Sequence, residues 1–232
     1  IIVEHGKTLV LENCTLTTCG TNMWRGIVLD KKGERNPPEI ELVGCFIENA
    51  QTGLSLTRDA IYSISGNTFN NCYIDIDMST YQSKVNPGAS GYIFGNTFTS
   101  TGTLLSPHGS DKKYAGIVLN DVEEITVGAA LSGTNNFNNS LYGIKSTNSS
   151  LKLINNTFSD IWDNSTSPTQ GTAVHAVSDF DQNDRFLIAG NGFGNGTNIF
   201  KEAMNGIYTE GEMNIDINKN TFGNSLAVND RL

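Results

Sequence analysis

The chain has 232 residues, with 24 glycines and a formal net charge of −9 at pH 7. No basic cluster occurs, which argues against a nucleic-acid partner, and no apolar run approaches the ~18–20 residues that span a bilayer. The composition, rich in glycine, asparagine and threonine, favours strands and turns over helices, and its acidic balance suits an extracellular protein.

One short pattern, an asparagine two residues before a phenylalanine, recurs along the chain. It is clearest in "SGNTFNNC" at 65–72 and "FGNTFTST" at 94–101. The central apolar residues of eight copies are Leu16, Ile47, Phe69, Phe98, Phe137, Phe158, Phe193 and Phe222. The residues two positions earlier are Cys14, Cys45, Asn67, Asn96, Asn135, Asn156, Asn191 and Asn220. Such self-similarity indicates a repeated structural unit.

Each copy predicts three short strands. The first has two inward residues, in chain order Leu9/Leu11, Ile40/Leu42, Tyr62/Ile64, Gly91/Ile93, Ala130/Ser132, Leu151/Leu153, Phe186/Ile188 and Ile215/Ile217. The second strand, after a corner, carries the asparagine and the central apolar residue on one face, because side chains two apart share a strand face. The third strand is expected at 25–29, 52–56, 73–78, 115–119, 142–146, 172–177 and 205–210.

These three strands predict one turn of a parallel β-solenoid. The expected fold is all-β, a right-handed, three-sided parallel β-helix of about eight coils with insertions at its corners, and 1–232 is one domain. Stacked coils would form an internal phenylalanine stack and an asparagine ladder. A β-sandwich would explain the alternation but not the fixed Asn-x-Phe spacing. Because the chain starts and stops inside such sequence, we expect a piece of a longer protein.

With this repeat, nearly the whole chain resembles the right-handed parallel β-helix proteins of the pectate-lyase-like superfold. The head of the chain, with Cys14 and Cys19, Met23–Ile27 and Ile47–Gly53, resembles more narrowly the β-helical regions of large secreted cell-surface proteins of Bacteroidetes. That resemblance implies a secreted or cell-surface location and export by the type IX system. It also implies a sorting domain, which these 232 residues do not contain. Because the ends of a solenoid are open sheet edges, we also expect neighbouring domains, caps or end-to-end contacts.

The four cysteines fall at two positions of the repeat. Cys14 and Cys45 occupy the asparagine position on neighbouring coils, so a Cys14–Cys45 disulfide is compatible with the ~4.8 Å strand spacing. Cys19 and Cys72 are two coils apart, which is too far for a bond. The alternative is that all four are small core residues.

Aromatic residues in and beside the corner loops are candidates for carbohydrate binding. His108, Tyr114, Trp162 and Phe200 lie in the longer excursions, and His175 and Tyr208 are expected on the outer face of the third strand. The alternative is that the loop aromatics only anchor the loops. The candidate ligand-binding set is His108, Tyr114, Trp162, His175 and Tyr208.

Acidic residues supply two further candidates. Asp75 and Asp77 are expected to point outward together from the third strand, as an acid/base pair, a cation site or two solvated acids. Asp179, Asp181 and Asn183 match the start of a calcium loop, but Asp184 and Gly190 stand where that loop needs Gly and Glu. Apart from this calcium candidate, no cofactor is expected.

The catalytic sets of β-helix enzymes are missing from the sequence. There is no clustered calcium site with an arginine base, and none of the paired-aspartate and G-H-G segments of glycoside hydrolases. We therefore expect a non-catalytic stalk or adhesive module that binds polysaccharide or another cell-surface partner. A polysaccharide lyase or glycoside hydrolase is the alternative.

Overall fold

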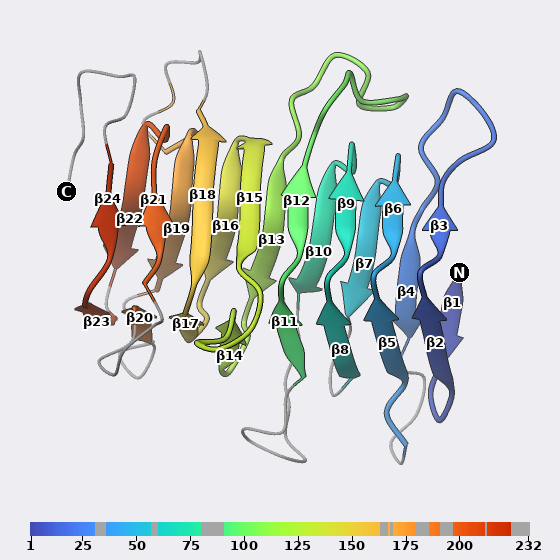
Figure 1. Ribbon diagram of the computed structural model, residues 1–232, viewed down its shortest axis with the longest axis horizontal. Helices are drawn as coiled ribbons and strands as arrows, with labels where there is room; N and C mark the ends of the chain where they lie inside the picture. Colours follow the sequence, from blue (N-terminus) through green and yellow to red (C-terminus); the bar gives the residue numbers. More distant parts are fainter. Residues whose placement is uncertain are drawn as a thin grey trace.

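The computed structural model describes residues 1–30, 36–56, 60–79, 91–162, 167, 169–179, 186–190, 197–211 and 213–223. In this part of the chain all regular structure is β-strand, and every pairing between named strands is parallel. Three strands per turn wind around one axis, which confirms the parallel β-helix (Figure 1). No helix of the described residues is long and apolar enough to cross a membrane.

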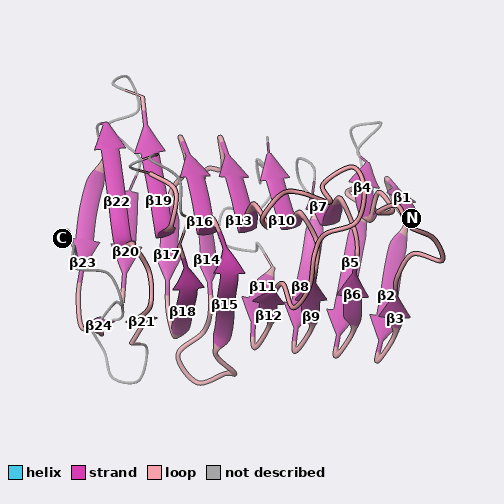
Figure 2. Ribbon diagram, turned by 90° about the horizontal axis from the view of Figure 1, so that it is seen from above, coloured by secondary structure: helices cyan, strands magenta, loops and turns pink. Residues whose placement is uncertain are grey.

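Two sides of the solenoid are eight-stranded sheets. Sheet I contains, in order, β1 (Ile2–Glu4), β4 (Ile27–Asp30), β7 (Thr52–Leu56), β10 (Ile74–Ser79), β13 (Ala115–Asn120), β16 (Tyr142–Thr147), β19 (Thr172–Ser178) and β22 (Asn205–Gly211). Sheet II contains β3 (Thr15–Leu16), β6 (Phe46–Glu48), β9 (Thr68–Asn70), β12 (Thr97–Thr99), β15 (Asn135–Ser140), β18 (Asn156–Ile161), β21 (Ile199–Phe200) and β24 (Thr221–Phe222). Figure 2 shows these two rows of strands from above.

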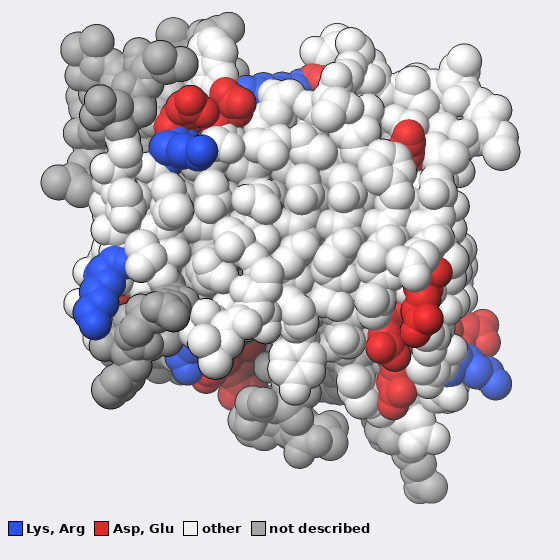
Figure 3. All heavy atoms as spheres, viewed as in Figure 1, with Lys and Arg blue, Asp and Glu red and all other residues white. Residues whose placement is uncertain are grey.

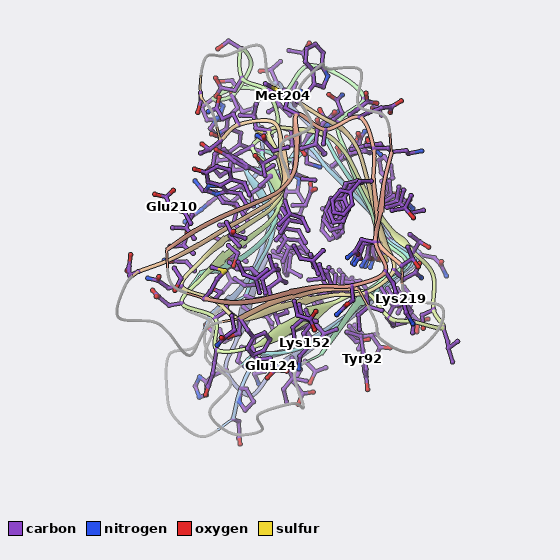
Figure 4. All side chains as sticks on the ribbon, turned by 90° about the vertical axis from the view of Figure 1, so that its left-hand side faces the viewer. Tyr92, Glu124, Lys152, Met204, Glu210 and Lys219 are labelled. Atoms are coloured by element: carbon purple, nitrogen blue, oxygen red, sulfur yellow. The ribbon has the colours of Figure 1, made fainter. Side chains whose placement is uncertain are left out.

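The third side is divided into two four-stranded sheets. Sheet IIIa contains β2 (Thr8–Glu12), β5 (Glu39–Val43), β8 (Ile61–Ser65) and β11 (Tyr92–Phe94). Sheet IIIb contains β14 (Ile125–Val127), β17 (Leu151–Leu153), β20 (Phe186–Ala189) and β23 (Asn214–Ile217). Seen along the axis, the coils enclose a three-sided interior that is filled with side chains (Figure 4).

The predicted phenylalanine stack is present inside sheet II. Ring centroids of successive members are 5.4, 4.6, 4.8, 5.0 and 4.8 Å apart. The members are Phe69, Phe98, Phe137, Phe158, Phe200 and Phe222. Phe200, not Phe193, is therefore the stacked residue of its coil; 191–196 lie outside the described residues.

The predicted asparagine ladder runs beside the stack. The Nδ2 group of each asparagine donates to Oδ1 of the next at 2.9–3.2 Å, in the order Asn67, Asn96, Asn135, Asn156, Asn198 and Asn220. Each Nδ2 also donates to a backbone carbonyl of sheet IIIa or IIIb, such as Leu42 O at 2.9 Å from Asn67. The buried amides are thus satisfied from coil to coil. Asn198 takes the place predicted for Asn191.

Two first-strand predictions were wrong. Ile125 and Val127 of β14, not Ala130 and Ser132, pair with β17 and are buried. In β20 the inward residues are Leu187 and Ala189, one position away from the expected Phe186 and Ile188. Both errors come from counting back from the repeat across loops of unequal length.

The corners explain the asparagine content. Between sheets III and II the chain turns through left-handed residues such as Asn13 (φ 50°), Gly44 (φ 63°) and Asn155 (φ 58°). Between sheets II and I it turns through Asn71 (φ 53°) and Asn139 (φ 52°), each two residues after the stacked phenylalanine. Glycine and asparagine are the residues that adopt this conformation most readily. Their recurrence therefore marks the bends of the solenoid.

Candidate functional site

A continuous row of aromatic rings crosses sheet I. We call it the aromatic strip; it consists of Tyr73, Tyr114, Tyr142, His175 and Tyr208. Successive ring centroids are 5.6, 5.5, 5.5 and 5.2 Å apart. The rings come from β10, β13, β16, β19 and β22 or from the residue just before the strand, so four strand spacings of ~4.8 Å make the strip about 19 Å long.

Local sequence places three rings of the strip at the leading edge of sheet I and two further along their strands. Tyr73 and Tyr114 immediately precede β10 and β13, and Tyr142 is the first residue of β16. His175 and Tyr208 lie further along β19 and β22, where they are paired in register with each other and with Lys145. Tyr73 and Tyr114 are stacked, as are His175 and Tyr208, whereas Tyr142 meets its neighbours edge-on or tilted.

The loop from 100 to 114 covers the first ring of the strip. His108 stacks on Tyr73 with ring centroids 3.6 Å apart and planes 4° apart, and its Nδ1 lies 2.8 Å from Asp111 Oδ2. Burial, followed by the nearby Asp111 carboxylate, raises the pKa of Tyr73, so its phenol stays protonated as a donor. His108, Asp111 and Tyr73 thus form one wall of the strip.

Lys145 brings a positive charge to the middle of the strip. Its Nζ donates to Tyr114 Oη at 2.5 Å and lies 5.1 and 5.2 Å from the ring centroids of Tyr114 and Tyr142. Among the described residues, no carboxylate is within ion-pair distance of this ammonium group. An ammonium held by rings and a phenol alone can bind an anionic or strongly polar group of a ligand.

His175, with Tyr142, is one of the two buried rings of the strip. It is 7% exposed, between the rings of Tyr142 and Tyr208, and neither ring nitrogen has a hydrogen-bond partner. Burial, followed by the positive charge of Lys145, lowers the pKa of His175 to about 4. The imidazole is therefore neutral at pH 7, with one nitrogen able to accept a proton or a hydrogen bond.

A buried ion pair ties the 100–114 loop to the solenoid. Lys113 Nζ contacts Asp75 Oδ2 and donates to Thr99 O at 3.0 Å, and both charged side chains are fully buried. Burial raises the pKa of Asp75 to about 7, against the attraction of Lys113. Burial and the Asp75 charge also raise the pKa of the neighbouring Cys72 thiol. The pair fixes the chain immediately before Tyr114.

The prediction of an outward Asp75/Asp77 pair was wrong. Asp77 pairs with Ser55 and Val118, in the outward row where Asp75 was expected. Asp75 lies between the register positions of Gly53 and Gly116 and is buried against Lys113. The strand begins one residue later than predicted, at Ile74, and its register is shifted by two residues against the other third strands. The two carboxylates therefore do not form one site.

Four of the five predicted ligand-binding residues come together. His108, Tyr114, His175 and Tyr208 belong to the strip or stack on it, but Trp162 lies at the corner before sheet I, beside Lys112. The structure adds Tyr73, Tyr142 and Lys145, which the sequence reasoning missed. A tyrosine at the start of three successive third strands, in "YIDID", "YAGIV" and "YGIKS", was the available signal.

The remaining site predictions have separate outcomes. All four cysteines, Cys14, Cys19, Cys45 and Cys72, are free thiols in the structure. Of the calcium candidates, Asp181 and Asn183 lie outside the described residues, and Asp179 exchanges two 2.8 Å hydrogen bonds with Asn148. Within the described ranges, no three His, Cys, Asp or Glu side chains are grouped as metal ligands.

Comparison with known proteins adds little to this geometry. No protein-family model matches the chain, and no curated protein sequence matches it. Among solved structures, the alginate lyase of Paenibacillus sp. str. FPU-7 is similar at 11% sequence identity and a TM-score of 0.26, covering 95% of this chain and 91% of that one. At these values the likeness carries no information about the activity of this chain.

Proposed function

We propose that this chain is a polysaccharide-binding β-helix module of a secreted or cell-surface protein, and that the aromatic strip is its binding site. The observation that carries the proposal is the continuous row of rings, phenols and one lysine across sheet I. Tyr73, Tyr114, Lys145 and Tyr208 are partly exposed, and polar groups placed along such a strip suit a ligand that repeats along its own length. A stalk or adhesive role follows from a rigid solenoid that carries such a strip on one side.

Sheets II and IIIa lie on other sides of the solenoid than the strip, which crosses sheet I. The view onto sheets II and III shows acidic residues near the margins and a broad area without charged residues between them (Figure 3). Tyr92, an exposed tyrosine of sheet IIIa, projects away from the interior on a different side (Figure 4). It therefore provides a matched control for the tyrosines of the strip.

The test is binding of the protein to a panel of immobilised neutral and acidic polysaccharides, by affinity electrophoresis. Tyr208→Ala and Lys145→Met should each weaken binding of the retained polysaccharide about tenfold or more, the scale of one interaction of about 1.4 kcal/mol. Tyr92→Ala should bind like the wild type. Unchanged binding in both strip variants would refute the site, and no retention by any polysaccharide would refute the function.

A second candidate function, polyuronate lyase activity, is favoured by the contact of Lys145 with Tyr114 beside neutral His175. In a β-elimination, a base takes the C5 proton of a uronate, the C4–O4 bond breaks, a C4=C5 double bond forms and O4 takes a proton. Lys145 would neutralise the carboxylate, His175 would accept the C5 proton and Tyr114 would protonate O4. Release of unsaturated uronate from polygalacturonate, measured by ultraviolet absorbance, tests this reaction. If the wild-type protein releases no such product, the lyase activity is refuted and polysaccharide binding remains the proposed function.

A further inference from the structure

A polar recess lies at the corner between sheets II and I, formed largely by the loop that carries His108. Its volume is about 410 Å³. Hydroxyl, amide and glycine backbone groups make up most of the lining, which consists of Ser100, Thr101, Gly102, Thr103, Gly109, Ser110, Asp111, Lys112, Lys113 and Asn139. The recess is thus rich in groups that can both donate and accept hydrogen bonds.

Hydrogen bonds hold the walls of the recess in place. Asn71 Oδ1 accepts from the backbone N–H groups of Thr101 and Gly102 at 2.9 and 3.1 Å. On the other side, Asn139 Nδ2 donates to Ser100 O. Lys113 is fixed by Asp75, as described above. The recess is therefore preformed, and binding a ligand costs little conformational entropy of the protein.

An exposed indole stands beside the recess. Trp162 is 47% exposed, and Lys112, which lines the recess, places its Nζ 5.3 Å from the Trp162 ring centroid. Lys112 Nζ also donates to the Trp162 carbonyl, so the two residues are joined through both backbone and ring. A large apolar ring next to convergent hydroxyl and amide groups suits a pyranose, which has one C–H face and a rim of hydroxyls.

The charges of the lining favour an uncharged ligand. Of the three charged residues in the lining, Lys113 is paired with buried Asp75, Asp111 lies 2.8 Å from His108 Nδ1, and Lys112 contacts Trp162. A uronate or a sulfated sugar would face the Asp111 carboxylate, and a cation would face Lys112. We propose that the recess binds one uncharged pyranose residue, with its hydroxyls in the recess and its C–H face on the part of the Trp162 ring that Lys112 does not cover. The proposal rests on the proposed function only for the class of ligand, because none of the five rings of the strip lines the recess.

The experiment uses Trp162 as its own reporter. The chain has two tryptophans, so Trp24→Phe leaves Trp162 as the only indole. Its emission is followed during titration with cellohexaose, mannohexaose and xylohexaose, and with hexagalacturonate as the acidic probe. We expect a saturable change with at least one neutral hexaose and none with hexagalacturonate. If Trp24→Phe does not fold, the difference between wild type and Trp162→Phe gives the same signal.

Variants separate this inference from the proposed function. Thr103→Val, which removes one hydroxyl of the recess, should weaken the neutral hexaose about tenfold or more, the scale of about 1.4 kcal/mol, whereas Tyr208→Ala should leave the Trp162 response unchanged. An unresponsive Trp162 with all three neutral hexaoses overturns the recess, even where the strip still binds polysaccharide. A Trp162 response that is lost in Tyr208→Ala also overturns it, because the strip would then be the site. If Trp162 still responds to the neutral hexaose and the strip variants bind polysaccharide like the wild type, the recess is supported and the strip is refuted.

Discussion

Asp75 and Lys113 form an ion pair with both side chains fully buried, at a register position where the neighbouring coils carry glycine. The space at this register position is confined, because a Cβ at Gly116 would lie 2.6 Å from Phe137 Cδ1. The Asp75 carboxylate can be buried there only because Lys113, from the following loop, pairs with it. The pair therefore couples a loop that contributes to two candidate sites to the core of the solenoid.

Removing one partner of this pair should be costly. Lys113→Met removes the cation that pairs with buried Asp75, and we expect the free energy of unfolding to fall by about 3–5 kcal/mol. The double variant Asp75→Gly/Lys113→Met should recover much of that loss. Lys152→Met is the matched control, because its pair with Glu124 is 36% and 46% exposed and should contribute about 0–1 kcal/mol. Urea unfolding measures all four proteins; equal losses in the two single variants would contradict the prediction.

The pH dependence of stability should carry a signature of Asp75. Its pKa is raised from 3.8 to about 7 in the folded protein, so the folded state holds the proton more tightly than the unfolded state. The stabilising contribution is therefore complete below the unfolded pKa and is lost as the pH rises through about 7. The wild-type free energy of unfolding minus that of Asp75→Asn should decrease from pH 4 to pH 7. A constant difference over this range would show that Asp75 titrates normally.

His175 should titrate far below an ordinary histidine. Its pKa is lowered from 6.5 to about 4 by burial and then by Lys145, so its contribution to stability is present above pH 6.5 and is lost as the pH falls through about 4. Its imidazole proton resonances should accordingly move only near pH 4. Lys145→Met removes the repelling charge and should raise that midpoint, whereas Lys152→Met, outside the strip, should not. A midpoint near 6.5 in the wild-type protein would contradict the enclosed position.

The asparagine ladder should be a major source of stability in its interior and less so at its end. Asn135→Ala removes the acceptor of the Asn96 N–H and leaves the Ile93 carbonyl without this donor. We expect a loss of about 2–5 kcal/mol, since unmade buried hydrogen bonds cost ~1–3 kcal/mol each. Asn220→Ala, at the partly exposed last rung, should lose less. Thermal or urea unfolding compares the two variants. If both lose the same free energy of unfolding, the interior rungs of the ladder stabilise the fold no more than its last rung, and the prediction is wrong.

The sequence predicted the stack and the ladder because both depend on a short local pattern. Phe69 and Asn67 identify the second strand of their coil, and the spacing of adjacent strands then brings equivalent residues of successive coils into contact. The pattern failed at Phe200, where "GNGF" at 190–193 imitates the repeat while the residue that stacks on Phe158 lies after it. A local pattern cannot tell which of two candidate phenylalanines meets the neighbouring coil.

The candidate sites were less predictable because they join residues from different coils. Lys145 and Tyr114 are brought together only by the exact register of β13 and β16, which follows from loop lengths as well as from the strand pattern. Asp75 looked like an exposed acid because alternation alone gave its direction. Its burial depends on Lys113, which arrives from the far end of a long loop.

The ladder also has a direction. Each amide from Asn67 to Asn198 donates to the coil that follows it, and at several rungs Oδ1 also accepts the backbone N–H of the coil before it, as Asn135 does for Asn96. At the first coils the ladder starts with Cys45, whose N–H donates to Asn67 Oδ1 but whose thiol offers no carbonyl in return. Coils are therefore not interchangeable building blocks. In an engineered solenoid, aspartate could replace asparagine only at a rung that accepts hydrogen bonds and donates none. Every rung that also donates to the next coil must keep an amide side chain.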